Sequence, residues 1–191
     1  LVKNLVKNKL LFITGAGLSY NEIPNLEPIR KKIKNYTVQE VILNPRLILD
    51  QVSPWFNTFF TSQPGRAHIA IKNICELLDS GVLTGNFDML QQKAGLIPFR
   101  IQGHLFGRYR EEFNKHHDKI ATLLVVGSSI DINGQIAEFR KANNGIKVIV
   151  MSYDENSIPD YVRDGDEVIF GDLNELLPSI YNKLKKIRDI N

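Results

Sequence analysis

An apolar strand that runs directly into a glycine-rich turn is the feature that most constrains how this chain folds. Residues 10–14 read Leu-Leu-Phe-Ile-Thr, and residues 15–19 continue as Gly-Ala-Gly-Leu-Ser. Glycine lets the chain turn sharply and removes the Cβ that would keep a ligand away from the backbone. Such a turn is typical of a strand-to-helix junction whose amides bind a phosphate at the positive end of the helix dipole. Phosphate-binding turns of this kind follow the pattern Gly-x-Gly-x-x-Gly, and Tyr20 stands here in place of the third glycine. A plain tight turn is therefore the alternative.

The composition is typical of one globular domain. The chain has 191 residues, of which 43% are hydrophobic and 24% charged, and its net charge is +3. The single cysteine, Cys75, lies in a helical pattern, so we expect it to be buried; it cannot form a disulfide within the chain or a four-cysteine zinc site. No apolar run approaches the ~20 residues of a membrane span, and the first residues lack the apolar region of a signal peptide. We therefore expect one cytoplasmic domain over residues 1–191, with no membrane partner.

Predicted strands and helices alternate along the chain. Strands are expected at residues 10–14, 82–84, 99–101, 121–126, 147–151 and 168–170, and helices at residues 67–78, 89–94, 108–119, 136–142 and 173–190. Gly81 and Gly95 are expected to end the two helices that precede them. This alternation predicts an α/β fold, a Rossmann-like parallel sheet with helices on both faces. The basic residues near the end (183, 185, 186 and 188) are expected in the solvated last turns of a helix, and nucleic acid is not an expected partner.

Two further segments interrupt this alternation. Residues 25–34 are polar and contain a proline. Residues 38–60 are apolar but broken by Pro45 and Pro54, which predicts short helices within an insertion at about residues 35–63. We expect the aromatic side chains of this insertion to pack inward: Trp55, Phe56, Phe59 and Phe60.

Glycine or a small polar residue follows every predicted strand. In parallel α/β sheets, ligands bind at the carboxyl ends of the strands, so these segments are the candidate site. They are Gly15-Ala16-Gly17-Leu18-Ser19, Gly85-Asn86-Phe87-Asp88, Gln102-Gly103-His104, Gly127-Ser128-Ser129, Ser152-Tyr153-Asp154 and Gly171-Asp172-Leu173.

Taken in order, these segments resemble the motifs of the sirtuin family over nearly the whole chain. The matching segments are Gly15-Ala16-Gly17-Leu18-Ser19, Pro64-Gly65-Arg66-Ala67-His68, Thr84-Gly85-Asn86-Phe87-Asp88, Gln102-Gly103-His104, Gly127-Ser128-Ser129 and Gly171-Asp172-Leu173. Sirtuins consume NAD as a substrate, so the resemblance implies cleavage of the bond between nicotinamide and ribose. That bond breaks through an oxocarbenium-like state, which a nearby carboxylate or amide dipole stabilises.

The resemblance also implies roles for individual residues. His104 would be the general base that acts on a ribose hydroxyl, because the imidazole pKa lies near neutrality. Asn86 would contact the nicotinamide ribose, and Asp88 would hold the site in shape. The remaining NAD-binding positions are Gly15, Ala16, Gly17 and Ser19 at the pyrophosphate, Pro24 and Asn25 in the following loop, Gly127, Ser128 and Ser129 at the phosphate and ribose, and Ser152, Asp172 and Leu173, the last near the adenine.

Each of these residues also has a purely structural interpretation. Asn86 and Asp88 are good N-cap residues for the helix expected near Met89. His104 could be an ordinary loop histidine, and Ser128 and Ser129 could simply end a strand. We expect His68 to be a structural residue at the start of a helix. No residue is predicted to bind a metal.

The sequence departs from the sirtuin pattern in four places. The family's Gly-Ile-Pro-Asp-Phe-Arg run reads Glu22-Ile23-Pro24-Asn25-Leu26-Glu27, Gly85 replaces a glutamine, and Met151-Ser152 replaces an Ile-Asn pair. Only residues 105–120 separate His104 from the next strand, where most sirtuins carry a zinc module and part of the peptide groove. The sequence thus predicts a zinc-free, minimal sirtuin-like domain in which the NAD half is kept.

Three functions remain open from the sequence. If an acyl-lysine oxygen attacks the ribose, the protein is an NAD-dependent protein lysine deacylase whose partner is an acylated protein or peptide. If water attacks, it is an NAD glycohydrolase, with ADP-ribosyl transfer as the related possibility. A non-catalytic sensor of NAD or ADP-ribose is the third alternative, and the altered Asn25 and Glu27 favour it.

Overall fold

A parallel sheet forms the centre of the molecule. The structure, a computed structural model, describes residues 9–24, 27–100, 119–156 and 158–190. Within these residues the sheet has six strands: β1 (Leu10–Thr14), β2 (Gly81–Thr84), β3 (Phe99–Arg100), β4 (Thr122–Val126), β5 (Lys147–Ser152) and β6 (Glu167–Phe170). Their order in space is β3-β2-β1-β4-β5-β6, and all pairs are parallel. The order reverses between β1 and β4, so this is the switch point at which Rossmann-like sheets bind ligands.

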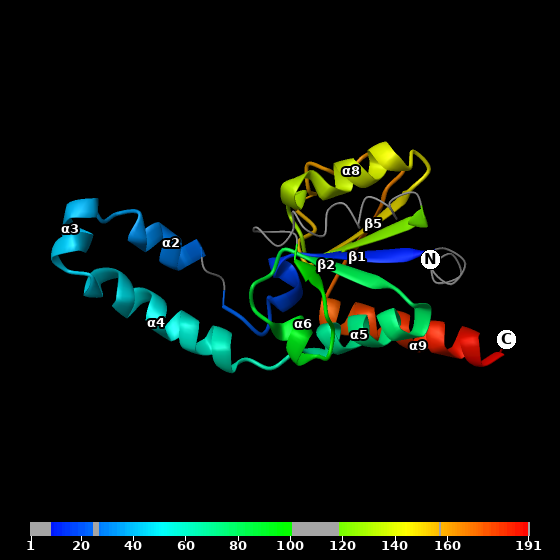
Figure 1. Ribbon diagram of the computed structural model, residues 1–191, viewed down its shortest axis with the longest axis horizontal. Helices are drawn as coiled ribbons and strands as arrows, with labels where there is room; N and C mark the ends of the chain where they lie inside the picture. The colour runs from blue at the N-terminus through cyan, green and yellow to red at the C-terminus, as the bar shows by residue number, and fades with distance from the viewer. Residues whose placement is uncertain (1–8, 25–26, 101–118, 157, 191) are drawn as a thin grey trace.

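Both faces of the sheet are covered, and the two central strands β1 and β4 are buried at every position. Successive side chains of a strand point to opposite faces. Leu10 and Phe12 therefore join the core under α5 (Arg66–Leu78) and α9 (Leu173–Ile190), whereas Leu11 and Ile13 join the core under α8 (Gln135–Ala142). Figure 1 shows α5 and α9 side by side below the sheet and α8 above it. The predicted fold class is confirmed.

Short elements connect the strands near the carboxyl edge of the sheet. A single 3₁₀ turn, η1 (Ala16–Ser19), follows β1, where a helix was expected. The short helix α6 (Leu90–Lys93) follows β2, and η3 (Ile132–Gly134) precedes α8. Cys75 is buried in the core on α5, as expected.

Three helices extend away from the sheet (Figure 1). They are α2 (Glu27–Ile33), α3 (Val38–Leu43) and α4 (Arg46–Thr61), and we call residues 27–61 the helical arm. None of the residues in these helices is buried. The prediction that the four aromatic residues pack inward is wrong for two of them, because Phe56 is 44% exposed and Phe60 67% exposed. Apolar side chains of α4 lie on more than one face of the helix, and only the stripe that includes Trp55 and Phe59 is half-buried.

The structure also corrects some predicted boundaries. Asp79, not Gly81, ends α5 in the left-handed conformation, which a short polar side chain tolerates, and Gly81 begins β2. Part of the polar segment 25–34 is helical as α2, where Pro28 occupies the first turn that tolerates proline. The helix expected at residues 108–119 lies almost wholly outside the described residues. No helix of the described residues combines the length and apolar character that a membrane crossing requires.

Candidate functional site

Two loops meet at the switch point between β1 and β4. A Cβ added to Gly15 would lie 2.7 Å from the carbonyl oxygen of Gly127, and one added to Gly127 would lie 2.2 Å from the amide nitrogen of Leu18. Gly127 also has φ +62°, a conformation that side chains disfavour. The glycines therefore allow the two loops to pack backbone against backbone.

Backbone hydrogen bonds within the turn and to the neighbouring strand and loop use amides that the sequence interpretation assigned to a phosphate. The amide of Gly15 donates to Val126 O (3.0 Å), that of Gly17 to Gly127 O (2.8 Å) and that of Leu18 to Gly15 O (3.0 Å). The turn is also only one 3₁₀ turn long, so its dipole is small. The glycine turn here builds the floor of a crevice, and those three amides are not available to an anion.

Two adjoining pockets open on this floor. Pocket A has a volume of about 410 Å³ and pocket B about 380 Å³. They share Ala16, Gly17, Tyr20, Gly85 and Asn86, so together they form one crevice along the carboxyl edge of the sheet. A crevice of this size is ordinary for a small-molecule site.

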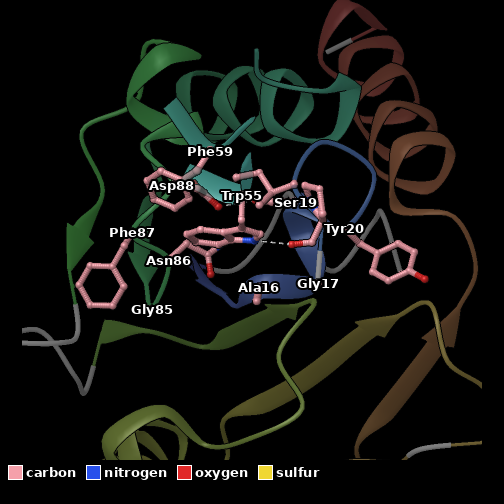
Figure 2. Close-up of a pocket in the computed structure, with 12 residues that line it drawn as sticks. Ala16, Gly17, Ser19, Tyr20, Trp55, Phe59, Gly85, Asn86, Phe87 and Asp88 are labelled. Atoms are coloured by element: carbon pink, nitrogen blue, oxygen red, sulfur yellow. Dashed lines mark hydrogen bonds between the residues drawn. The ribbon is translucent and has the colours of Figure 1, made fainter. Parts of the chain in front are cut away.

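Pocket A is largely apolar and has an aromatic wall (Figure 2). Trp55 and Phe59 reach it from α4, with ring centroids 5.0 Å apart. The indole Nε1–H of Trp55 donates to the carbonyl oxygen of Pro24 (2.7 Å). On the body side the pocket is lined by Ser19, Asn86 and Asp88.

A chain of hydrogen bonds links α5, η1 and α6 behind pocket A. The Gly65 amide donates to His68 Nδ1 (3.2 Å), so the proton of the neutral ring is assigned to Nε2, which donates to Ser19 Oγ (3.2 Å). Ser19 Oγ in turn donates to Asp88 Oδ2 (2.5 Å), and Asp88 Oδ1 accepts from the Leu90 amide (3.0 Å). Each donor in this series of hydrogen bonds has an acceptor, so the series fixes the loop between β2 and α6.

The buried imidazole of His68 stays neutral at physiological pH. Burial lowers its pKa to about 4, against an opposing effect of the nearby Asp88 carboxylate. The ring is fully buried and contacts neither pocket. His68 is thus a structural residue at the start of α5, as expected.

Asn86 belongs to both pockets. Its backbone amide donates to Thr84 Oγ1 (3.1 Å), and its side-chain Nδ2 donates to the Gly15 carbonyl oxygen (3.0 Å). The second bond holds the side chain across the boundary between the pockets. It uses one of the two hydrogens of the side-chain amide, so the other hydrogen and Oδ1 are the atoms that Asn86 can offer to a ligand.

Pocket B is lined by the ends of β4 and β5. Ser128, Ser129, Ser152 and Asp154 are its polar residues outside the shared floor and Tyr153. The Tyr153 hydroxyl donates to Asp172 Oδ1 (3.0 Å), and its ring lies 5.4 Å from that of Tyr20. Burial, followed by the Asp172 contact, raises the pKa of Tyr153 to about 12, so the hydroxyl stays protonated.

Most of the predicted site residues that the structure describes line this crevice. They are Gly15, Ala16, Gly17, Ser19, Pro24, Asn86, Asp88, Gly127, Ser128, Ser129 and Ser152. Two do not: Asp172 binds Tyr153 and the Asn174 amide, and the Leu173 side chain is fully buried in the core. His104 and Asn25 lie outside the described residues.

Sequence reasoning missed several residues of the crevice. Tyr20, Ile23, Trp55, Phe59, Ile130 and Ile132 line it but were not assigned to a site. The aromatic residues of α4 were noted only as a source of core packing. No local signal distinguishes a helix face that packs on a core from one that closes a pocket.

Comparison with known proteins identifies the fold. No family model matches the chain, and no curated protein matches its sequence. Among solved structures, a mutant Sir2 homologue in complex with ADP-ribose is 16% identical with a TM-score of 0.76, covering 100% of this chain and 97% of that one.

Two further solved structures give the same result. A Sir2 homologue in complex with NAD is 17% identical with a TM-score of 0.73, covering 97% and 93% of the two chains. Sir2 bound to acetylated peptide is 16% identical with a TM-score of 0.67, covering 95% and 96%. The chain therefore has the fold of the Sir2, or sirtuin, proteins.

Proposed function

We propose that this protein binds NAD along the crevice and cleaves the bond between nicotinamide and ribose. The observation that carries the proposal is the pair of adjoining pockets at the switch point, with Asn86 on their boundary. Two joined pockets suit a ligand with two separate ring systems. The likeness to Sir2 homologues in complex with NAD and with ADP-ribose supports the same ligand.

In this proposal the adenosine half lies in pocket B and the nicotinamide end in pocket A. The hydroxyls and the carboxylate of pocket B suit ribose hydroxyls, which donate and accept hydrogen bonds. The aromatic wall of pocket A suits a flat ring, which stacks on aromatic side chains. Asn86 on the boundary would contact the ribose whose bond is broken.

The chemistry required of the residues is modest. Cleavage develops positive charge on the ribose, and the Asn86 side-chain oxygen would stabilise it as a fixed dipole. The Asp88 carboxylate lies in the same pocket and adds negative charge, although both its oxygens already accept hydrogen bonds. His104, by its resemblance to the sirtuin histidine, would be the general base on a ribose hydroxyl.

An acyl-lysine oxygen is the first candidate acceptor and water is the second. Sir2 bound to acetylated peptide has the same fold, which supports a peptide substrate. The short sequence between His104 and β4, residues 105–121, favours water, because most sirtuins carry part of the peptide groove there.

Nicotinamide release from NAD tests the proposal. Release without peptide identifies water as the acceptor, whereas release only with an acetylated peptide identifies a deacylase. Asn86→Ala should lower release by about 100-fold, the usual effect of removing one preorganised polar group. The matched control, Asn73→Ala in a separate pocket between α5 and α9, should leave release unchanged. His104→Ala should abolish turnover and keep binding.

Two results would overturn the proposal in whole or in part. Saturable NAD binding without release would identify a binding module instead of an enzyme. The absence of both binding and release would exclude NAD as the ligand.

A further inference from the structure

The two walls of pocket A differ in how firmly the surrounding structure holds them in place. The wall formed by Ser19, Asn86 and Asp88 belongs to the sheet body, where these side chains are nine-tenths or more buried. The opposite wall is Trp55 and Phe59 of α4, in an arm without a buried residue. The shape of pocket A therefore depends on the contacts that hold the end of α4 against the body.

Lys93 makes the most direct of these contacts. Its ammonium group donates to the carbonyl oxygens of Phe60 (2.9 Å) and Ser62 (2.7 Å), at the carboxyl end of α4. A cation at this end of a helix satisfies carbonyls that have no partner within the helix, and it complements the helix dipole. Both acceptors lie directly beyond Phe59, the last aromatic residue of the pocket wall.

Lys93 also lies on the helix that directly follows the loop of Asn86 and Asp88. It lies on α6, whose first amide, that of Leu90, is held by Asp88. Two other links attach α4 and its C-cap to the body: the Trp55 indole bonded to Pro24 O, and the Ser62 hydroxyl bonded to Glu22 O (2.9 Å). Both of those links reach the loop after η1. Among these links, which all join described residues, the one from Lys93 ties the end of α4 to the Asn86 and Asp88 side of the pocket.

We propose that Lys93 is a positioning residue that holds the aromatic wall of α4 over pocket A and so sets the affinity for the ring bound there. The inference rests on the proposed function, in which the nicotinamide end of NAD occupies pocket A. ADP-ribose lacks that ring, so its affinity should depend much less on Lys93. Lys93 does not contact the ligand.

The test uses Lys93→Met, which keeps the length of the side chain and removes its charge. Lys93→Arg is the conservative variant that can restore the contact with the two carbonyls. The control is Lys147→Met: Lys147 makes an ion pair with Glu167 (2.9 Å) at the start of β5, the edge of the sheet opposite the crevice. Lys93 is exposed, so its replacement should leave the core intact, which far-ultraviolet circular dichroism verifies.

Two readouts are measured for each variant. The first is the affinity for NAD and for ADP-ribose, by calorimetry. The second is the fluorescence of Trp55, which is the single tryptophan of the sequence and therefore reports only on this wall. Lys93→Met should weaken NAD binding by about tenfold, leave ADP-ribose binding within about twofold, and shift the Trp55 emission to longer wavelength. Lys93→Arg should restore most of both signals, and Lys147→Met should change neither.

The outcomes separate this inference from the proposed function. If Lys93→Met lowers the affinities for NAD and ADP-ribose equally, or changes neither, the inference is wrong. If the wild-type protein binds neither ligand, the proposed function fails. If the Trp55 emission is then also unchanged in Lys93→Met, the positioning role is overturned as well. If the emission shifts, Lys93 does position the aromatic wall, and only the assignment of NAD as the ligand is wrong.

Discussion

The sheet body and the helical arm differ in what holds their residues in place. All five residues of β1 and all five of β4 are buried, and their apolar side chains join cores on both faces of the sheet. In α2, α3 and α4 no residue is buried, and Val38, Ile42 and Leu43 are each more than 70% exposed. The body is stabilised by burial of apolar surface, whereas the arm depends on local helix signals and a few polar links.

The local signals of the arm are visible in its sequence. Thr37 and Glu40 form a capping box at the start of α3, in which each side chain binds the backbone amide of the other residue. Such signals contribute little to stability compared with the packing of apolar side chains. Helices as short as α3 are only marginally stable on their own. One crevice can therefore have a rigid floor and a weakly held wall, because regions that bury little surface open most readily.

The largest difference is expected from one substitution made in both regions. Phe139→Ala removes a fully buried ring of α8 and should lower the free energy of unfolding by about 4 kcal/mol. Phe60→Ala removes a ring that is 67% exposed on α4 and should change it by less than about 0.5 kcal/mol. Urea denaturation measures both. Equal losses in the free energy of unfolding would mean that the Phe60 side of the arm is covered in solution. The contrast between a buried body and an exposed arm would then be wrong.

The floor of the crevice should be less tolerant of a single methyl group than the end of η3 at Gly134. Gly127→Ala places a Cβ against the Leu18 amide at a positive φ, and we expect a loss of about 3 kcal/mol in the free energy of unfolding. Gly134→Ala is the control: its φ is +70°, yet nothing lies within 4 Å of its Cβ position, so only the conformational cost of about 1 kcal/mol applies. Similar losses for the two variants would contradict the backbone-to-backbone packing of the two loops.

Much of the fold could be predicted from the sequence, because its signals are local. The apolar run of β4 and the amphipathic pattern of α5 each determine one element, and both were predicted within one residue. The candidate crevice was also predictable, since the carboxyl ends of parallel strands meet at one edge. That reasoning brought Gly17, Asn86 and Ser128 together without any knowledge of their contacts.

The features that the sequence could not predict depend on contacts between distant segments. Ser19 meets His68 and Asp88, which are 49 and 69 positions away along the chain. Whether the Gly17 amide is available to a ligand depends on how closely the loop of Gly127 approaches it, because the Gly127 carbonyl oxygen accepts its hydrogen bond. In α4 the sequence shows apolar residues on more than one face, and it does not say which of them has a partner.

Acidification should affect the body and spare the arm, and the expected difference is no larger than that between the two glycine variants. Burial lowers the pKa of His68 to about 4, whereas in the unfolded chain this residue keeps its usual value of 6.5. As pH falls below 6.5 the unfolded state binds a proton that the folded state does not, so stability decreases until the pH passes about 4. Between pH 7.5 and pH 5 this linkage removes about 2 kcal/mol.

His68→Gln is the variant that isolates this effect. Glutamine can still donate to Ser19 Oγ but does not titrate, so the decrease in the free energy of unfolding between pH 7.5 and pH 5 should be smaller by about 2 kcal/mol than in the wild type. In the arm, hydrogen bonds from Thr37 lower the pKa of Glu40, so the capping box keeps its charge down to pH 5. Amide exchange of α3, corrected for intrinsic rates, should therefore not change over this range. If His68→Gln keeps the full pH dependence, other groups cause it, and the neutral imidazole does not distinguish the body from the arm.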